Sequence, residues 1–96
     1  MEQILKSIFQ IFTTQAKNGA VDCLDEFVPL AADNTPAKTV YISNTSGVNL
    51  LVNQDGTSFI LPDGAIFPFN NVGLLKNLSV KTADDSGATV TFRYEH

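Results

Sequence analysis

The chain has 96 residues, a formal net charge of −4 and 44% hydrophobic residues, which is the size and composition of one small domain. The acidic balance argues against a nucleic-acid-binding protein, because such a protein needs a basic surface to neutralise phosphates. A single cysteine excludes an internal disulfide framework, and no segment is apolar over the length that a bilayer requires.

The first segment, residues 1–16, has the pattern of an amphipathic helix. At 100° per residue its large apolar side chains fall on one face and its polar side chains on the other. The apolar face consists of Ile4, Leu5, Ile8, Phe9, Ile11 and Phe12. The face can pack on the protein's own β domain, on another protein or on a membrane. The membrane is the least favoured, because surface-binding helices carry a basic polar face and Glu2 offsets Lys6 here.

The same segment argues against a secretory signal. Lys6 and Gln10 interrupt its apolar residues, and Glu2 follows Met1 where a signal has basic residues. We therefore expect synthesis in a cytoplasm.

Residues 17–38 connect this helix to the rest of the chain. The run KNG at 17–19 predicts a turn that ends the helix. Val21, Leu24 and Val28 then share a helical face, which predicts a short helix that ends at Pro29, with a turn and a strand as the alternative. The run AADNTPAK at 31–38 is typical of a linker. These features divide the chain into a helical arm, residues 1–34, and a β domain, residues 35–96.

From residue 38 onward the sequence has β patterning. Short runs of β-branched and aromatic residues alternate with turn residues, and they predict strands at 39–43, 48–53, 57–61, 65–69, 77–82 and 88–95. The last strand has the clearest alternation, because Val90, Phe92 and Tyr94 share one face. The predicted fold is therefore mainly β: a small antiparallel β-sandwich of about six strands, preceded by the amphipathic helix.

A repeat with the pattern DG-x-x-F occurs twice, at Asp55–Phe59 and Asp63–Phe67. Asp-Gly is a strong signal for a tight turn, so we interpret both copies as hairpin turns whose phenylalanines enter the core. The alternative is a calcium loop, which needs several converging oxygen ligands. Asp55 and Asp63 have no such ligands beside them in the sequence, although Asp84 and Asp85 could meet one of them in the folded chain.

Pro68 falls inside the predicted strand 65–69. Proline cannot donate a hydrogen bond to a neighbouring strand, so this strand is predicted to be an edge strand or to be bulged. An edge strand in a small domain needs a cover, and a partner subunit is one such cover.

The sequence contains none of the usual catalytic patterns. The single cysteine, Cys23, sits between apolar residues and is typical of a buried side chain, and the single histidine is the last residue, His96. The glycines follow turn spacing, and neither a phosphate loop nor a nucleophile motif is present. We therefore expect a protein without enzymatic activity, cofactor or metal.

The run from Val40 to Glu95 resembles small structural proteins of bacteriophage virions. The likeness rests on the turn NTSG at 44–47, the segment DGTSFILPDG at 55–64, the strand LSV at 78–80 and the Thr/Val-rich last strand. The resemblance implies a component of a capsid, neck or tail, such as a capsid decoration protein, that assembles in several copies. It implies no catalytic residue and does not extend to the N-terminal helix.

These observations predict a non-enzymatic virion structural protein, made in the host cytoplasm, that binds other virion proteins and forms a homo-oligomer. The alternatives are a β module that binds a carbohydrate or a host surface, and a small inhibitor of a host protein. No nucleic-acid or membrane partner is expected. The candidate interaction residues are Ile4, Ile8, Phe9, Ile11, Phe12 and Pro68.

Overall fold

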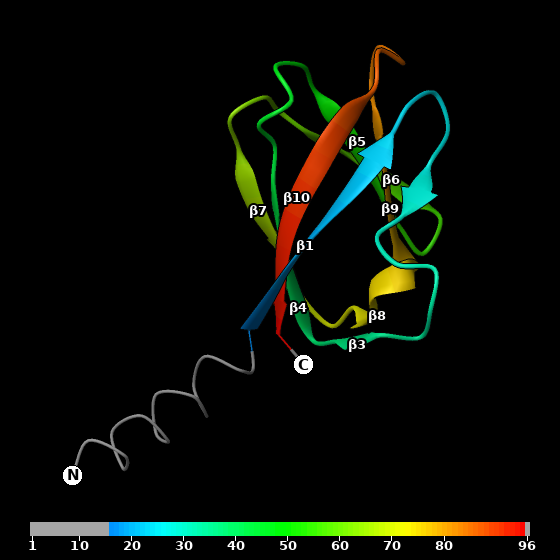
Figure 1. Cartoon of the computed structure of the whole chain (residues 1–96), viewed down its shortest axis with the longest axis vertical. Coiled ribbons are helices and arrows are strands. Elements are labelled where there is room, and N and C mark those ends of the chain that lie inside the picture. The colour runs from blue at the N-terminus through cyan, green and yellow to red at the C-terminus, as the bar shows by residue number, and fades with distance from the viewer. Residues whose placement is uncertain (1–15, 96) are drawn as a thin grey trace, which may run out of the picture.

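The computed structural model describes residues 16–95, which fold mainly as β-strands (Figure 1). The segment predicted as an amphipathic helix, with Ile4, Ile8, Phe9, Ile11 and Phe12, lies outside the described residues except for its last residue, Ala16, which begins the first strand. The only helical turn in the described part is the 3₁₀ turn η1 (Leu75–Asn77).

The strands are short, and all their pairings are antiparallel. In chain order they are β1 (Ala16–Cys23), β2 (Val28–Pro29), β3 (Pro36–Ala37), β4 (Thr39–Ser43), β5 (Leu50–Gln54), β6 (Thr57–Leu61), β7 (Ile66–Phe69), β8 (Gly73–Leu74), β9 (Leu78–Thr82) and β10 (Ala88–Glu95). The predicted strands at 39–43, 57–61 and 88–95 are confirmed to the residue, and the other three agree to within two residues.

Eight strands form two four-stranded sheets, and two form a short ribbon. The sheets have the orders β1-β10-β4-β7 and β2-β9-β5-β6, and β3 pairs with β8. Apart from the ribbon strands β3 and β8, each strand is followed in the chain by a strand of the other sheet, except at the β5–β6 hairpin. The first and last strands of the chain, β1 and β10, are paired in one sheet, and β2 is paired with β9 in the other. This strand order is that of a jelly roll.

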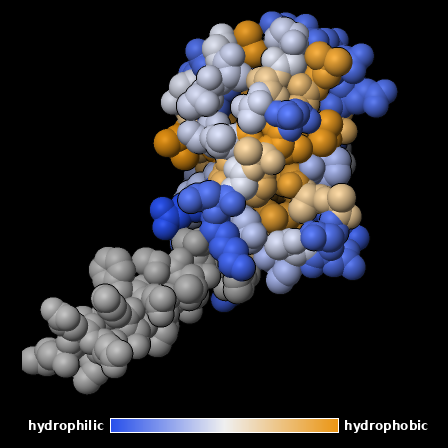
Figure 2. All heavy atoms as spheres, in the orientation of Figure 1, coloured by the Kyte–Doolittle hydropathy of each residue, from blue (hydrophilic) through white to orange (hydrophobic). Residues whose placement is uncertain are grey.

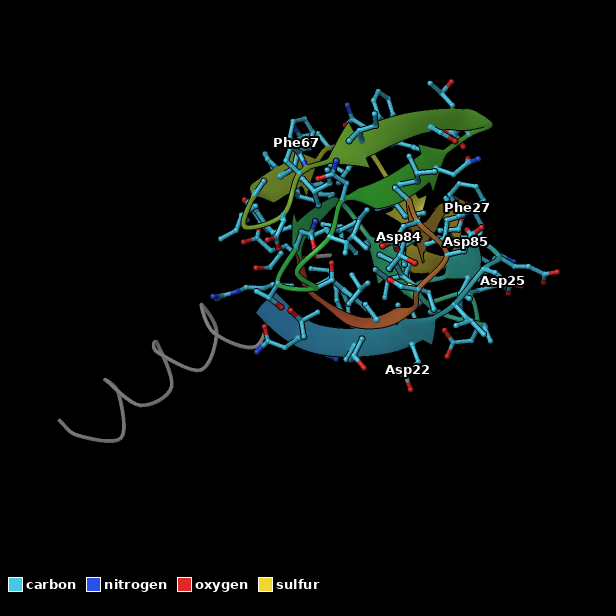
Figure 3. All side chains as sticks on the ribbon, turned by 90° about the horizontal axis from the view of Figure 1, so that it is seen from above. Asp22, Asp25, Phe27, Phe67, Asp84 and Asp85 are labelled. Carbon is cyan, nitrogen blue, oxygen red and sulfur yellow. The ribbon has the colours of Figure 1, made fainter. Side chains whose placement is uncertain are left out.

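The hydrophobic core lies between the two sheets (Figure 3). Alternate residues of each central strand point inward, as the period of two requires. The fully buried members include Val40 and Ile42 of one sheet and Leu50 and Val52 of the other. Val90 and Phe92 of β10 are buried and Tyr94 is half-buried, so the face predicted for these three residues is confirmed.

The prediction for residues 17–28 is wrong. The run KNG is no turn but lies in the first half of β1, whose eight residues pair with β10 without interruption (Figure 1). The short helix around Val21, Leu24 and Val28 does not form, since Val21 belongs to β1 and Val28 to β2. The chain bends at residues 24–26 between these strands, which agrees with the alternative of a turn followed by a strand. Pairing with a long neighbouring strand overrides the local turn signal, because strand formation depends on cross-strand context. β1 and β2 both fall within residues 1–34 and belong to the two sheets.

The two copies of the DG repeat have different structures. Asp55 and Gly56 form the two-residue turn of the β5–β6 hairpin, with φ of 52° and 83°, as predicted. The second copy joins β6 to β7 in different sheets, so its prediction as a hairpin turn is wrong. The prediction that Phe59 and Phe67 fill the core is also wrong, because their side chains are 46% and 50% exposed.

Candidate functional site

The largest group of exposed apolar side chains lies on the two edge strands β6 and β7. Among residues 16–95, six large hydrophobic side chains are exposed, and two of them, Leu24 and Phe27, lie in the connection between β1 and β2. The other four lie on the two edge strands, and we call them together the open edge: Phe59 and Phe67 on the inward faces of β6 and β7, and Ile60 and Ile66 on the outward faces. In Figure 2 one orange group of atoms stands out on the flank of the molecule where β7 lies in Figure 1.

The open edge exists because β6 and β7 end the two sheets on the same side of the core. Phe59 shares the inward face of β6 with buried Leu61, and Phe67 shares the inward face of β7 with buried Phe69. The ring of Phe69 packs against both, with centroid distances of 6.3 Å to Phe59 and 5.0 Å to Phe67. In the described part of the chain no further strand covers the rings of Phe59 and Phe67, so both remain half-exposed.

A groove of about 330 Å³ runs between the two edge strands. Every side chain in its lining is apolar: Phe59, Ile60, Leu61, Pro62, Ala65, Phe67 and Phe69. Such a lining offers no side-chain hydrogen bond to a sugar hydroxyl or a phosphate. It favours an apolar occupant, and exposed apolar patches commonly mark protein–protein contacts.

Pro68, the one predicted interaction residue in the described part of the chain, does lie on an edge strand. β7 pairs with β4 only, and Pro68 is opposite Tyr41. Phe59, Ile60, Ile66 and Phe67 were not predicted as interaction residues. Their signal in the sequence is the absence of any charged residue from 57–62 and 65–69, combined with apolar side chains on both faces of each strand.

A second hollow, of about 410 Å³, lies on the outer face of the β1-β10-β4-β7 sheet. Its polar side chains include Asn18, Tyr41 and Arg93, all of which are at least partly exposed. Since solvent reaches each of these groups, nothing in this hollow fixes the orientation of a ligand.

The acidic side chains of residues 16–95 take part in local pairs and turns. No group of three histidine, cysteine, aspartate or glutamate side chains lies together among residues 16–95. Asp85 pairs with Lys81 at 2.6 Å, and Asp84 accepts hydrogen bonds from Ser86 within the same turn. Asp63 accepts from the backbone N–H of Gly47 at 3.0 Å. In Figure 3 Asp84 and Asp85 lie away from Phe67.

Cys23 is buried, as predicted, and its thiol donates to the backbone oxygen of Ala88 at 3.5 Å. A nucleophilic cysteine needs an exposed thiol and a positioned base. Cys23 thus has the environment of a structural side chain.

Neither a family model nor a curated protein matches this chain at a significant level. No helix among the described residues is long and apolar enough to cross a bilayer.

Proposed function

We propose that this protein is a non-enzymatic structural subunit of a bacteriophage particle, which attaches to the capsid, neck or tail through protein–protein contacts. The open edge is the observation that carries the proposal. Its four large apolar side chains are 46–67% exposed on two neighbouring edge strands that have no charged residue. Contact with another protein would remove this surface from water, with a gain of roughly 25 cal/mol per Å² of apolar area.

The strand order supports the particle as the location. Jelly rolls are common in viral capsid domains, and the resemblance of residues 40–95 to small virion proteins points the same way. One fold serves many functions, so the strand order supports a virion location only by analogy. The open edge adds the contact surface that an assembly subunit needs.

A carbohydrate-binding function is less well supported, although lectin domains also use jelly rolls. Sugar recognition needs polar groups that converge on the hydroxyls, and the groove between β6 and β7 has only apolar side chains. The exposed rings of Phe59 and Phe67 would have to bind a sugar without such polar groups beside them.

The test is attachment of the tagged protein to purified particles of the bacteriophage that encodes it. We expect cosedimentation at a fixed number of copies per particle. Ile66→Lys places a charge on the open edge and should abolish attachment. Ala20→Lys adds the same charge at an exposed position of β1, at the opposite edge of the sheet from β7, and should leave attachment unchanged. Particles that neither contain nor bind the protein would contradict the proposal, and capture of a host enzyme instead would favour an inhibitor.

A further inference from the structure

The two sheets have four edge strands, and three of them have a feature that hinders the addition of another strand. β1 has the exposed charges of Lys17 and Asp22, β2 has only two residues including Pro29, and β7 contains Pro68. Charges, prolines and short length are the usual protections of an edge. β6, with the sequence TSFIL, has none of the three. It is therefore the edge that is open to strand addition.

The turn before β6 determines which backbone groups of this strand are free. Gln54 and Thr57 flank the two-residue turn and form its hydrogen-bonded pair. Because antiparallel pairs alternate, Phe59 and Leu61 also direct their N–H and C=O groups toward β5. The N–H and C=O groups of Ser58 and Ile60 therefore point away from the sheet. No strand accepts or donates to them in the described part of the chain.

We propose that β6 is a self-association site, at which the β6 strand of a second copy adds in an antiparallel arrangement. With Phe59 opposite Phe59 of the other copy, Ser58 of each copy pairs with Ile60 of the other. All free groups of the two strands are then used, in four backbone hydrogen bonds. The pair of phenylalanines falls at a non-hydrogen-bonded position, where the two Cα atoms are about 4.5 Å apart. Moving one strand by two residues, the smallest shift that keeps the free groups of both strands facing each other, pairs Ser58 with Pro62, which lacks an N–H, or Ile60 with Gly56 in the turn.

A second copy fits this edge better than an arbitrary strand for two reasons. The contact is isologous, so one unprotected strand satisfies the other, as in the commonest class of homo-oligomer. The chain has a net charge of −4, and β6 has no charged side chain. Two acidic copies can therefore pair through β6 without placing like charges on the paired strands. The nearest charges, Asp55 and Asp63, lie at the two ends of β6. Their repulsion is screened by salt, so association should strengthen with ionic strength.

The self-association site rests on the proposed function, because an assembly subunit is present in several copies. It assigns the β6 half of the open edge to the second copy. The β7 half, with Ile66 and Phe67, stays available to another particle protein.

The test is the mass of the full chain in solution, measured by light scattering and sedimentation over a range of concentrations. We expect a dimer. Ile60→Lys and Ser58→Pro should each raise its dissociation constant at least tenfold, because the first adds a charge and the second removes an outward donor. Ile66→Lys is the matched control, since both isoleucines are 67% exposed, and it should leave the dimer unchanged. A monomer at all concentrations, or a dimer that survives both β6 variants, would overturn the inference.

The register has its own test in a Cys23→Ala background. Phe59→Cys should form a disulfide between two copies on mild oxidation, since opposed residues at this position have a suitable Cα separation. Ile60→Cys should not, because Ile60 faces Ser58. Efficient cross-linking through residue 60 and not 59 would overturn the register. The two proposals can fail separately. A monomer that attaches to particles would contradict only the self-association, and a β6 dimer that never attaches would contradict only the particle function.

Discussion

The ring of Phe92 on β10 fills the space that a side chain at Gly19 on β1 would occupy. The two residues are opposite each other in the sheet, and a Cβ atom at position 19 would lie 2.5 Å from Cζ of Phe92. Phe92 is 6% exposed, so its ring has little room to move. Gly19 is therefore needed for close packing of an aromatic ring on the backbone of the neighbouring strand, and not for a turn.

This relationship predicts that Gly19→Ala destabilises the fold by about 1–3 kcal/mol, the usual cost of an extra methyl group in a packed core. Phe92→Leu removes the atoms that clash, so the double variant should lose less stability than the sum of the single variants, with a coupling of about 1 kcal/mol. Urea unfolding of the four proteins measures the coupling. Additive losses, or a Gly19→Ala variant as stable as the original chain, would contradict the packing argument.

The same glycine explains where reading the sequence failed. Strands with regular alternation and clear turns, such as Thr39–Ser43 and Ala88–Glu95, were predicted to the residue, because each is specified by its own side chains. β1 was not predicted, because the run KNG is by itself a turn signal. Only the ring of Phe92 on the neighbouring strand explains the glycine as part of a strand. The two-residue strands β2, β3 and β8 are too short to show a period.

The candidate site was only partly predictable, for a related reason. Alternation places Phe59 and Phe67 on the inward faces of their strands, and the contacts with Phe69 agree. Whether an inward face is covered depends on the order of strands in the two sheets, which local pattern does not specify. The proline at position 68 did indicate an edge strand, and β7 is one.

Asn44 predicts a second stability effect. Its side chain is 1% exposed, and its Nδ2 donates to the backbone oxygens of Val48 and Leu61, each at 2.8 Å, while Oδ1 accepts from Ser46. It thereby links the β4–β5 connection to the end of β6.

Asn44→Ala removes a donor from the buried oxygen of Leu61 and another from the part-buried oxygen of Val48, which still accepts from the hydroxyl of Ser46 at 2.9 Å. We expect a loss of about 1–3 kcal/mol in the free energy of unfolding, the cost of one buried group that loses its partner. Asn53→Ala is the control, because Asn53 accepts one bond at an exposed turn, from Gly56, and should cost less than about 1 kcal/mol. Similar losses for both variants in urea unfolding would show that burial of the Asn44 network has no special weight.

Asp84 predicts a change in titration. The hydroxyl of Ser86 and then its backbone N–H donate to the carboxylate, at 2.6 Å and 3.1 Å, and they lower the pKa of Asp84 below its ordinary value of 3.8. A lowered pKa in the folded state gives stability that is present above the unfolded pKa and lost as the pH falls through the folded one. Ser86→Ala removes the largest cause, so the pKa of Asp84 should rise. Carboxyl NMR titration measures it, and an unchanged midpoint would refute the assignment to Ser86.

The difference in exposure between Phe67 and Phe69 predicts that the exposed ring of Phe67 can be removed without loss of the fold. The two rings are 5.0 Å apart on the same face of β7, but Phe69 is 4% exposed and Phe67 is 50% exposed. Phe69→Ala should cost about 3–5 kcal/mol, as for other buried phenylalanines, which is a large part of the stability of a small domain. Phe67→Ala leaves a smaller cavity and exposes less new surface, so it should cost about 1–2 kcal/mol. Thermal and urea unfolding test the difference. If Phe67→Ala unfolds the protein as readily as Phe69→Ala, the ring belongs to the core and the open edge loses half of its β7 surface. If the variant stays folded and no longer attaches to particles, the exposed ring serves the contact and not the fold.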